Sequence, residues 1–166
     1  MNEENRYAPP KAEVADLSEG DAELASLGLR LGGAIIDGII SWVVMFPLMF
    51  VTGFWSSAMA GAVNFGAQLT LSAVGILVFF ALNGYLLAKG GQTIGKRLVG
   101  TRIVSVTDGQ ILPLVRVASL RYLPIWVIAL VPFVGNLIAL VDILFIFRED
   151  RRCLHDHIAG TRVVNA

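Results

Sequence analysis

Residues 31–54 read LGGAIIDGIISWVVMFPLMFVTGF, and a second run of the same kind, residues 69–88, reads LTLSAVGILVFFALNGYLLA. An α-helix needs about 20 apolar residues to cross the roughly 30 Å hydrocarbon layer of a bilayer, and both runs are long enough. The first run contains one charged residue, Asp37, and the second contains none. We therefore expect two membrane-spanning helices, the first with a kink favoured at Pro47, which removes a backbone donor.

The composition of the whole chain agrees with these two runs. Of its 166 residues, 55% are hydrophobic and only 16% are charged, against roughly a quarter charged in soluble domains. The formal net charge is zero, which gives no bulk attraction to nucleic acid. The lone Cys153 excludes a disulfide framework and a cysteine zinc site. These features predict an integral membrane protein of one domain, with no cofactor and no enzymatic centre, since no Ser-His-Asp set or nucleophile elbow is present.

The first 25 residues differ sharply from the rest of the chain. They carry seven acidic residues, two bases and the pair Pro9-Pro10. Such a segment buries too little apolar surface to fold, so we expect a disordered cytoplasmic tail over residues 1–25 and a membrane domain over 26–166. Because the first apolar run follows this acidic tail, we expect it to be kept as a span and not cleaved as a signal peptide.

The basic residues predict the topology. They lie just before the first span, after the second span and after the last apolar run, and by the positive-inside rule these three places are cytoplasmic. The residues are Arg30, then Lys89, Lys96, Arg97 and Arg102, then Arg148, Arg151, Arg152 and Arg162. An even number of crossings follows, and both termini are expected in the cytoplasm. The uncharged stretch 55–68 is then a short loop outside.

The last apolar region, 123–147, is long enough for one crossing but contains the break signal Pro132 to Asn136. We therefore expect a hairpin with spans at about 114–131 and 136–147. The second arm is only about 18 Å long, which leaves a half-depth hairpin open as an alternative, as well as one straight span. The fold class expected is an all-α membrane protein of about four transmembrane helices.

A small β element is expected on the cytoplasmic side. Residues 97–106 alternate and are rich in β-branched side chains, and Asp108-Gly109 is a turn signal. The sequence predicts a strand or hairpin there, with residues 161–164 as a candidate partner strand.

Charged and polar side chains inside spans are costly and are candidates for function. Counted at 1.5 Å per residue from the nearest boundary base, four such side chains lie at about the same depth, 8 to 10 Å. They are Asp37, Asn83, Arg121 and Asp142. We hypothesise one polar cluster that holds a proton or a small cation. The alternative, that these groups join helices by hydrogen bonds or fix their register by an ion pair, stays open.

Residues 90–96 match the first seven positions of a phosphate-binding loop, Gly-x4-Gly-Lys. Arg97 stands where that loop needs Ser or Thr for magnesium, and the preceding element is a membrane span in place of a buried strand. We therefore interpret the segment as a tight interfacial turn whose Lys96 and Arg97 meet anionic lipid head groups.

His155-Asp156-His157 combines two imidazoles with a carboxylate. Alternate positions on an unknown backbone are a weak metal signal, and no metal site is predicted. Asp156 is instead expected to cap a turn or helix at the membrane surface, with Thr161 close behind.

Three motifs together resemble the RDD family of prokaryotic membrane proteins, which is named for one Arg and two Asp residues. They are Arg30 to Asp37, Gly91 to Leu98, and Leu154 to Val164. The resemblance implies that Arg30, Asp37 and Asp156 are the family's Arg and two Asp. It also implies roles for Gly91, Gln92, Thr93, Gly95, Lys96 and Thr161. Asp142, by contrast, is a candidate from depth alone.

The family resemblance implies a location in the prokaryotic cytoplasmic membrane, and transport is commonly suggested for such proteins, some of which resemble cation/proton antiporters. Our leading interpretation is a protein that handles a cation, proton or small solute through Asp37, and a homo-oligomer is left open. Asp142, Arg121 and Asn83 would support it. The rival interpretation is a membrane scaffold that binds another protein or anionic lipid through its basic surface.

Overall fold

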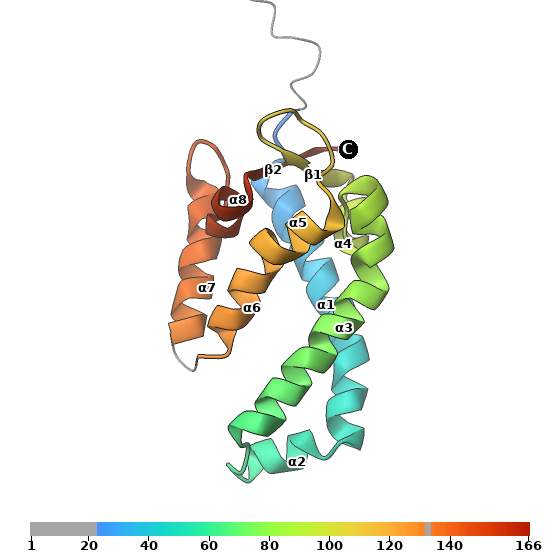
Figure 1. The fold of residues 1–166 in the computed structure, drawn as a ribbon, viewed down its shortest axis with the longest axis vertical. Helices are drawn as coiled ribbons and strands as arrows, with labels where there is room; N and C mark the ends of the chain where they lie inside the picture. The colour runs from blue at the N-terminus through green and yellow to red at the C-terminus, as the bar shows by residue number, and fades with distance from the viewer. Residues whose placement is uncertain (1–22, 132–133) are drawn as a thin grey trace, which may run out of the picture.

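A computed structural model describes residues 23–131 and 134–166. The fold is mostly helical, with two long helices, α1 (Leu27–Val51) and α3 (Phe65–Gly90), lying side by side as an antiparallel hairpin (Figure 1). Ser26 caps the start of α1 and Asn64 caps the start of α3 through their side-chain oxygens. The connection predicted as a loop contains a short helix, α2 (Phe54–Met59), at the far end of the hairpin.

The two long helices confirm that each apolar run forms a helix, as predicted. Both are long and apolar enough to cross a membrane. Large apolar side chains of α1 point outward along one face, and they are between 36% and 70% exposed: Leu31, Ile35, Ile39, Trp42, Val43, Phe46 and Phe50. An exposed apolar stripe of this length is typical of a surface that contacts lipid or another protein.

A second hairpin is shorter. Its first arm is a continuous helical run made of α5 (Leu114–Val117), a π-helical turn (Ala118–Tyr122) and α6 (Leu123–Ala129). Its second arm is α7 (Val134–Leu144) with a 3-10 turn, Phe145–Phe147. The predicted break at Pro132 to Asn136 lies between the arms, although residues 132 and 133 are outside the described residues. Residues 134–147 form an apolar helix that is shorter than a full span. In the described part of the chain, two helices therefore have membrane-spanning length.

The segments that carry the second and third sequence motifs fold into a cap over one end of both hairpins. We use this name for α4 (Ile94–Leu98), β1 (Thr101–Ser105), α8 (Leu154–Ala159) and β2 (Thr161–Asn165), which gather at the top of Figure 1. β1 and β2 pair antiparallel with Ile103 opposite Val163, so the predicted partner strand is confirmed.

The start of the described chain joins this sheet. Leu24 bridges to Val164, and the backbone N–H of Ala25 donates to the Val163 carbonyl at 3.1 Å. Residues 23–25, which we predicted to be part of the disordered tail, are therefore attached to the cap. The remainder of that predicted tail, residues 1–22, lies outside the described residues.

The buried core lies directly beneath the cap. It joins apolar side chains from the chain start, α3, β1, the loop before α5, α5 and β2: Ala25, Leu87, Ile103, Leu112, Val117 and Val163. In contrast, no residue of α2 or α6 is buried. The side chains that are withdrawn from solvent are thus concentrated at the cap end, which is where the polar motifs meet.

Candidate functional site

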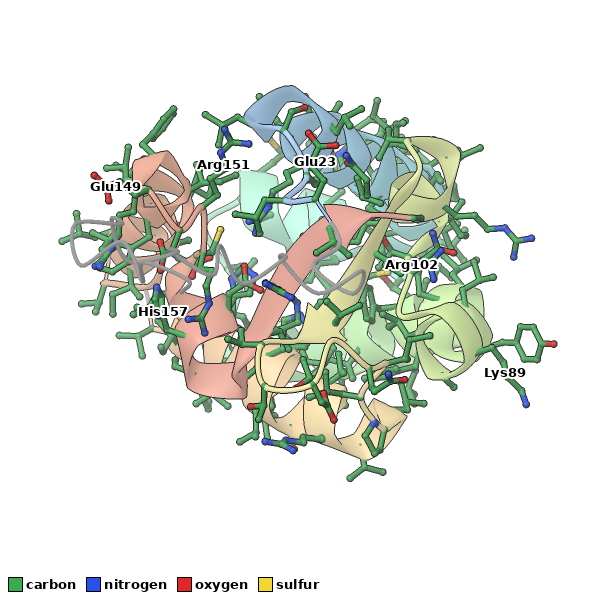
Figure 2. The ribbon with its side chains drawn as sticks, turned by 90° about the horizontal axis from the view of Figure 1, so that it is seen from above. Glu23, Lys89, Arg102, Glu149, Arg151 and His157 are labelled. Atoms are coloured by element: carbon green, nitrogen blue, oxygen red, sulfur yellow. The ribbon has the colours of Figure 1, made fainter. Side chains whose placement is uncertain are left out.

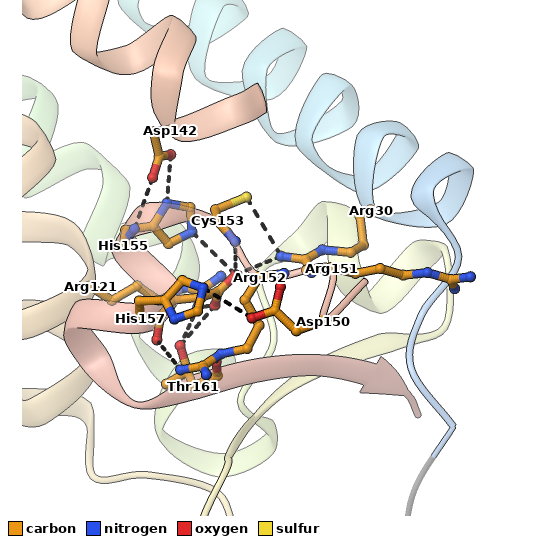
Figure 3. A network of polar contacts seen from close by, with 11 residues as sticks. Arg30, Arg121, Asp142, Asp150, Arg151, Arg152, Cys153, His155, His157 and Thr161 are labelled. Atoms are coloured by element: carbon orange, nitrogen blue, oxygen red, sulfur yellow. Dashed lines mark hydrogen bonds and ion pairs between the residues drawn. The ribbon is translucent and has the colours of Figure 1, made fainter. Parts of the chain in front are cut away.

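The carboxylate of Asp156 is the centre of a buried polar network, and its partners Arg30, Arg121 and Thr161 are labelled in Figure 3. Asp156 is fully buried, and its oxygens accept hydrogen bonds from Arg30 Nη2 at 2.6 Å, Thr161 Oγ1 at 2.8 Å and Arg121 Nη1. It also accepts from the backbone N–H of Cys153 at 3.2 Å. This last bond caps the start of α8, as the sequence predicted for Asp156.

The charges around Asp156 keep it ionised. Burial alone would raise its pKa, but the positive charge of Arg121, followed by His155 and Arg30, outweighs burial and holds the pKa well below its usual range. A carboxylate with this pKa and with both oxygens occupied does not exchange protons near neutral pH. Asp156 therefore acts as a fixed negative charge between two guanidinium groups.

Arg121 reaches this carboxylate from the second hairpin. It lies in the π-helical turn and is 3% exposed. Its Nη1 donates to Thr161 Oγ1 at 2.6 Å and to Asp156. A π-helical turn inserts one extra residue into an α-helix and is frequent at functional sites. Nothing in the sequence signals this insertion.

Arg30 reaches the same carboxylate from the first turn of α1. Its guanidinium lies 3.8 Å from Cys153 Sγ and also donates to the carbonyl oxygen of Arg151. Arg151 has a φ of 49°, a left-handed conformation that is uncommon outside glycine. We expected Arg30 to mark a solvated boundary, whereas it is 7% exposed and joins α1 to the loop before α8.

Asp142 belongs to the same network through His155. Asp142 accepts from the backbone N–H of His155 at 2.8 Å and lies 2.7 Å from the Nδ1 of that ring. His155 Nε2 is 3.9 Å from Asp156 Oδ2. Burial, and then the charge of Arg121, lowers the pKa of His155. We had separated Asp142, in the buried layer, from Asp156, on the cytoplasmic face. The structure instead places one imidazole between the two carboxylates.

Asp37 and Asn83 hold α4 against the long helices. Asp37 Oδ1 accepts from the backbone N–H of Gly95 at 2.7 Å, and its Oδ2 accepts from the Thr93 hydroxyl. Asn83 Oδ1 accepts from the backbone N–H of Ile94 at 2.9 Å. The first N–H groups of a helix have no partner within the helix. Here two side chains from membrane helices supply the acceptors.

The sequence comparisons agree with these motifs. The sequence model of the RDD family matches residues 24–160. This chain belongs to the RDD family. It is 34% identical over 142 residues to the uncharacterized protein YckC of Bacillus subtilis (strain 168), a match that covers 86% of this chain and 85% of the relative. It is 27% identical over 140 residues to an uncharacterized protein of Haemophilus influenzae, covering 84% and 77%. No solved structure matches the chain.

The glycines of the second RDD motif allow close backbone approach. Gly91 ends α3 with a φ of 62°, and a Cβ there would overlap the Ile103 carbonyl oxygen. A Cβ on Gly95 would lie 2.8 Å from the Asp37 Cγ and overlap the Gly33 carbonyl oxygen. These glycines thus serve a turn and a helix contact. The likeness to a phosphate-binding loop is explained without a nucleotide.

The other residues of the RDD motifs bind the cap together. Gln92 Nε2 donates to the Thr101 carbonyl at 2.8 Å, and the Thr93 side chain accepts from the backbone N–H of Lys96 at 3.3 Å. Arg97 is exposed. The three residues His155, Asp156 and His157 turn to different partners, and His157 Nε2 lies 3.1 Å from Asp150.

The four side chains that we predicted at one depth have separate partners. In the described ranges, no hydrogen bond or ion pair joins them to one another. Asp37 and Asn83 bond to the start of α4, Arg121 bonds to Asp156, and Asp142 bonds to His155. The physical reason is that α4 and α8 fold back onto the helices and satisfy each polar group locally. Counting residues from a boundary predicts the depth of a side chain in the membrane, but it does not predict which groups the side chain contacts.

One group of side chains has the spacing of a metal site. The ligand atoms of Asp142, Cys153 and His155 lie within 4.8 Å of one another. Burial, and then the charge of Asp156, raises the pKa of the Cys153 thiol to about 11. The guanidinium of Arg30 lies beside the sulfur. A protonated thiol next to a fixed positive charge is a poor ligand for a cation, so this set does not favour a metal.

An apolar cavity of about 390 Å³ lies between α1, α3 and α6. Ser41 and Ser72 contribute the hydroxyl groups of its lining, and Phe79 and Trp126 contribute aromatic rings. The ring of Phe79 also packs against Tyr122, the neighbour of Arg121, with centroids 4.8 Å apart. The rings of Phe79 and Tyr122 therefore lie between this cavity and Arg121.

Proposed function

We propose that this RDD protein crosses the bacterial cytoplasmic membrane several times and handles a proton, a small cation or a small solute through Asp37. In this proposal the α5 to α6 run and α7 are the third and fourth crossings, and both termini are cytoplasmic. The observation that carries the proposal is the hydrogen bond from the Gly95 backbone N–H to Asp37, which brings this carboxylate to the residue that precedes the partly buried Lys96 on α4.

Lys96 has the properties of a group that exchanges a proton under physiological conditions. Burial, and then the positive charge of Arg121, lowers its pKa to about 8, while the charge of Asp37 opposes the shift. A small change in its surroundings is enough to move such a lysine between its charged and neutral forms. In this proposal, Asp37 on α1 is the carboxylate whose interaction with Lys96 changes when the lysine loses its proton.

The remaining polar residues support this pair in the proposal. Asn83 fixes the start of α4, and Arg121 fixes α8 through Asp156. Asp142 orients His155. We propose that these residues position Lys96 and Asp37 and do not carry the solute themselves.

A conduit is proposed to need more than one copy of the chain. The cavity between the hairpins is lined mainly by apolar side chains, and an ion crossing a bilayer needs a wet path. We therefore propose a homo-oligomer embedded in lipid. No enzymatic reaction, cofactor or nucleic acid partner is part of the proposal.

The test is proton flux in proteoliposomes that contain a trapped pH-sensitive dye. We expect Asp37→Asn and Lys96→Gln each to lower the flux at least tenfold, while Lys89→Gln leaves it unchanged. Lys89 is a matched control because it is exposed in the last turn of α3. Flux in Asp37→Asn equal to that of the wild type would exclude Asp37 as the site.

A second candidate, a scaffold that binds anionic lipid, is favoured by the exposed bases around the cap. Lys89, Arg97 and Arg116 are exposed, and Figure 2 shows Lys89 projecting from one side of the molecule. In this proposal Arg97 and Lys96 meet lipid head groups. Native mass spectrometry tests it: phosphatidylglycerol should stay bound to the wild type and be lost in Arg97→Gln. Equal retention in both would rule it out.

A further inference from the structure

Lys96 is a partly buried, charged member of the second RDD motif, and only its backbone is used to hold the cap together. Its backbone N–H donates to Thr93 and its carbonyl accepts from Thr101. Over residues 23–131 and 134–166, no hydrogen bond or ion pair engages its ammonium group. The side chain is nevertheless partly buried. A partly buried ammonium without a direct partner is costly, so the group needs an explanation.

Arg121, whose charge acts on Lys96, has a donor that is not used within the described residues. Its Nη1 is engaged by Asp156 and Thr161, but its buried Nε has no hydrogen-bond partner. A buried N–H without a partner costs about 1 to 3 kcal/mol. In native proteins such groups usually meet a water, an ion or a ligand. Arg121 is also the charge that acts most strongly on Lys96.

The charges around Lys96 do not cancel. The groups that act on it are Arg121 from the π-helical turn, Asp37 and Arg30 from α1, and Asp156 from α8. Together with Lys96, they are three cations and two carboxylates, which leaves one positive charge. Both carboxylates are occupied by the bonds that hold α4 and α8. Among these five groups, Arg30 and Arg121 contact a carboxylate directly, and Lys96 is the cation that does not.

We propose that Lys96 and Arg121 bind a singly charged anion, with the Lys96 ammonium and the Arg121 Nε–H as donors. The chemistry required is one negative charge on acceptor oxygens. A free oxyanion and the phosphodiester of a lipid head group both provide it. Nitrate and phosphatidylglycerol are the probes that separate these two sources.

Anion binding is coupled to protonation of Lys96, and only this coupling rests on the proposed function. A bound anion favours the charged lysine, so binding takes up a proton where the lysine is otherwise neutral. Of the groups that face one another here, Lys96 is the one whose pKa lies at about 8. The affinity for the anion therefore falls as the pH rises above that value.

The experiment measures how fast acetic anhydride labels Lys96 as a function of pH, in the full chain in neutral detergent. Sodium nitrate is compared with sodium gluconate at equal ionic strength, because gluconate is too bulky for a buried site. Nitrate should move the midpoint of labelling upward by about one pH unit, which lowers labelling at pH 8 roughly fivefold and at pH 7 roughly tenfold. Lys89, labelled in the same sample, should not respond.

A second arm uses nanodiscs of phosphatidylglycerol or phosphatidylcholine. A shift with phosphatidylglycerol and none with nitrate assigns the site to lipid phosphodiester, and a shift with nitrate assigns it to free anions. No shift with either probe overturns the proposal. Arg121→Lys keeps a positive charge for Asp156 but lacks the Nε donor, so it should fold and lose the shift. A shift retained in full by this variant also overturns the proposal.

These outcomes are separate from those of the flux assay. A nitrate shift without proton flux removes the proposed function and leaves the anion site. Flux that depends on Lys96 without any nitrate or lipid shift removes the anion site and leaves the proposed function.

Discussion

The two ends of this molecule are held together by different forces. At the cap end, charged side chains that are 7% exposed or less join both hairpins to α8. At the far end, α2 and α6 have no buried residue, and apolar side chains face outward. In lipid, apolar surfaces gain little by meeting one another, so helix association depends on packing and polar bonds. The cap is thus where the fold is fixed.

The largest expected loss of stability at the cap end comes from replacing Asp156. Asp156→Asn removes the charge that Arg30 and Arg121 share, and leaves two buried guanidinium groups uncompensated. Breaking a buried ion pair costs about 3 to 5 kcal/mol. We expect a loss of this size in the free energy of unfolding, measured by denaturant titration in detergent.

The control is Asp150→Asn. Asp150 pairs with Arg148 and His157 at a surface where its side chain is 35% exposed. Exposed pairs contribute at most about 1 kcal/mol. If Asp156→Asn and Asp150→Asn lowered the free energy of unfolding equally, the buried ion pairs of the cap would not stabilise the fold more than an exposed pair does.

The far end should tolerate apolar changes but not charge. Val43 is 59% exposed on α1, and Val43→Lys should cost about 2.5 to 3.5 kcal/mol on insertion. The control is Val106→Lys. Val106 is an exposed residue directly after β1 in the cap, and the same change should not impair membrane integration there. The fraction of protein integrated into membranes measures the difference. Normal integration of Val43→Lys would mean that lipid does not cover this face.

The contact between α1 and α4 gives a smaller, steric test. Gly95→Ala places a methyl group against Gly33 and Asp37 and should cost about 1 to 3 kcal/mol. Gly28→Ala is the matched control, because a Cβ there meets nothing within 4 Å and alanine favours the helix by roughly 0.5 to 1 kcal/mol. Thermal unfolding should therefore shift in opposite directions. If Gly95→Ala were as stable as the wild type, Gly95 would not approach Gly33 and Asp37 as closely as described.

The smallest expected effect is a pH dependence from Lys96. Its pKa is about 8 in the folded chain against its ordinary value of 10.5, so between these values the unfolded chain binds more protons. Stability should therefore rise with pH across this window, by on the order of 1 kcal/mol after solvent screening. Lys96→Met should lack this rise. Identical pH profiles of the two unfolding midpoints in sodium gluconate would refute the lowered pKa.

The elements of the fold were largely predictable from the sequence because they follow from periodicity and length. The apolar runs predicted α1 and α3, and the β-branched segments predicted the pairing of β1 with β2. The number of crossings was not settled in the same way. Residues 134–147 are apolar but short, and hydropathy alone does not say how far such a segment enters the bilayer.

The partners of the polar residues were not predictable, for a physical reason. A depth count places Asp37 and Arg121 at one level but does not reveal that α4 and α8 fold back to bond with them. The π-helical turn that aims Arg121 has no sequence signal. Asp156 illustrates the difference best. Its capping role was predicted, but its burial between two arginines depends on residues more than 30 positions away.

The central claim is that the Asp156 carboxylate binds Arg121 directly and so joins the second hairpin to α8. A double-mutant cycle tests it, with Arg121→Met, Asp156→Leu and the double variant unfolded by denaturant in the same detergent. Groups in direct contact show a coupling energy of about 0.5 to 3 kcal/mol, and for this buried pair we expect about 2 kcal/mol or more. Additive losses, within about 0.5 kcal/mol, would contradict the claim.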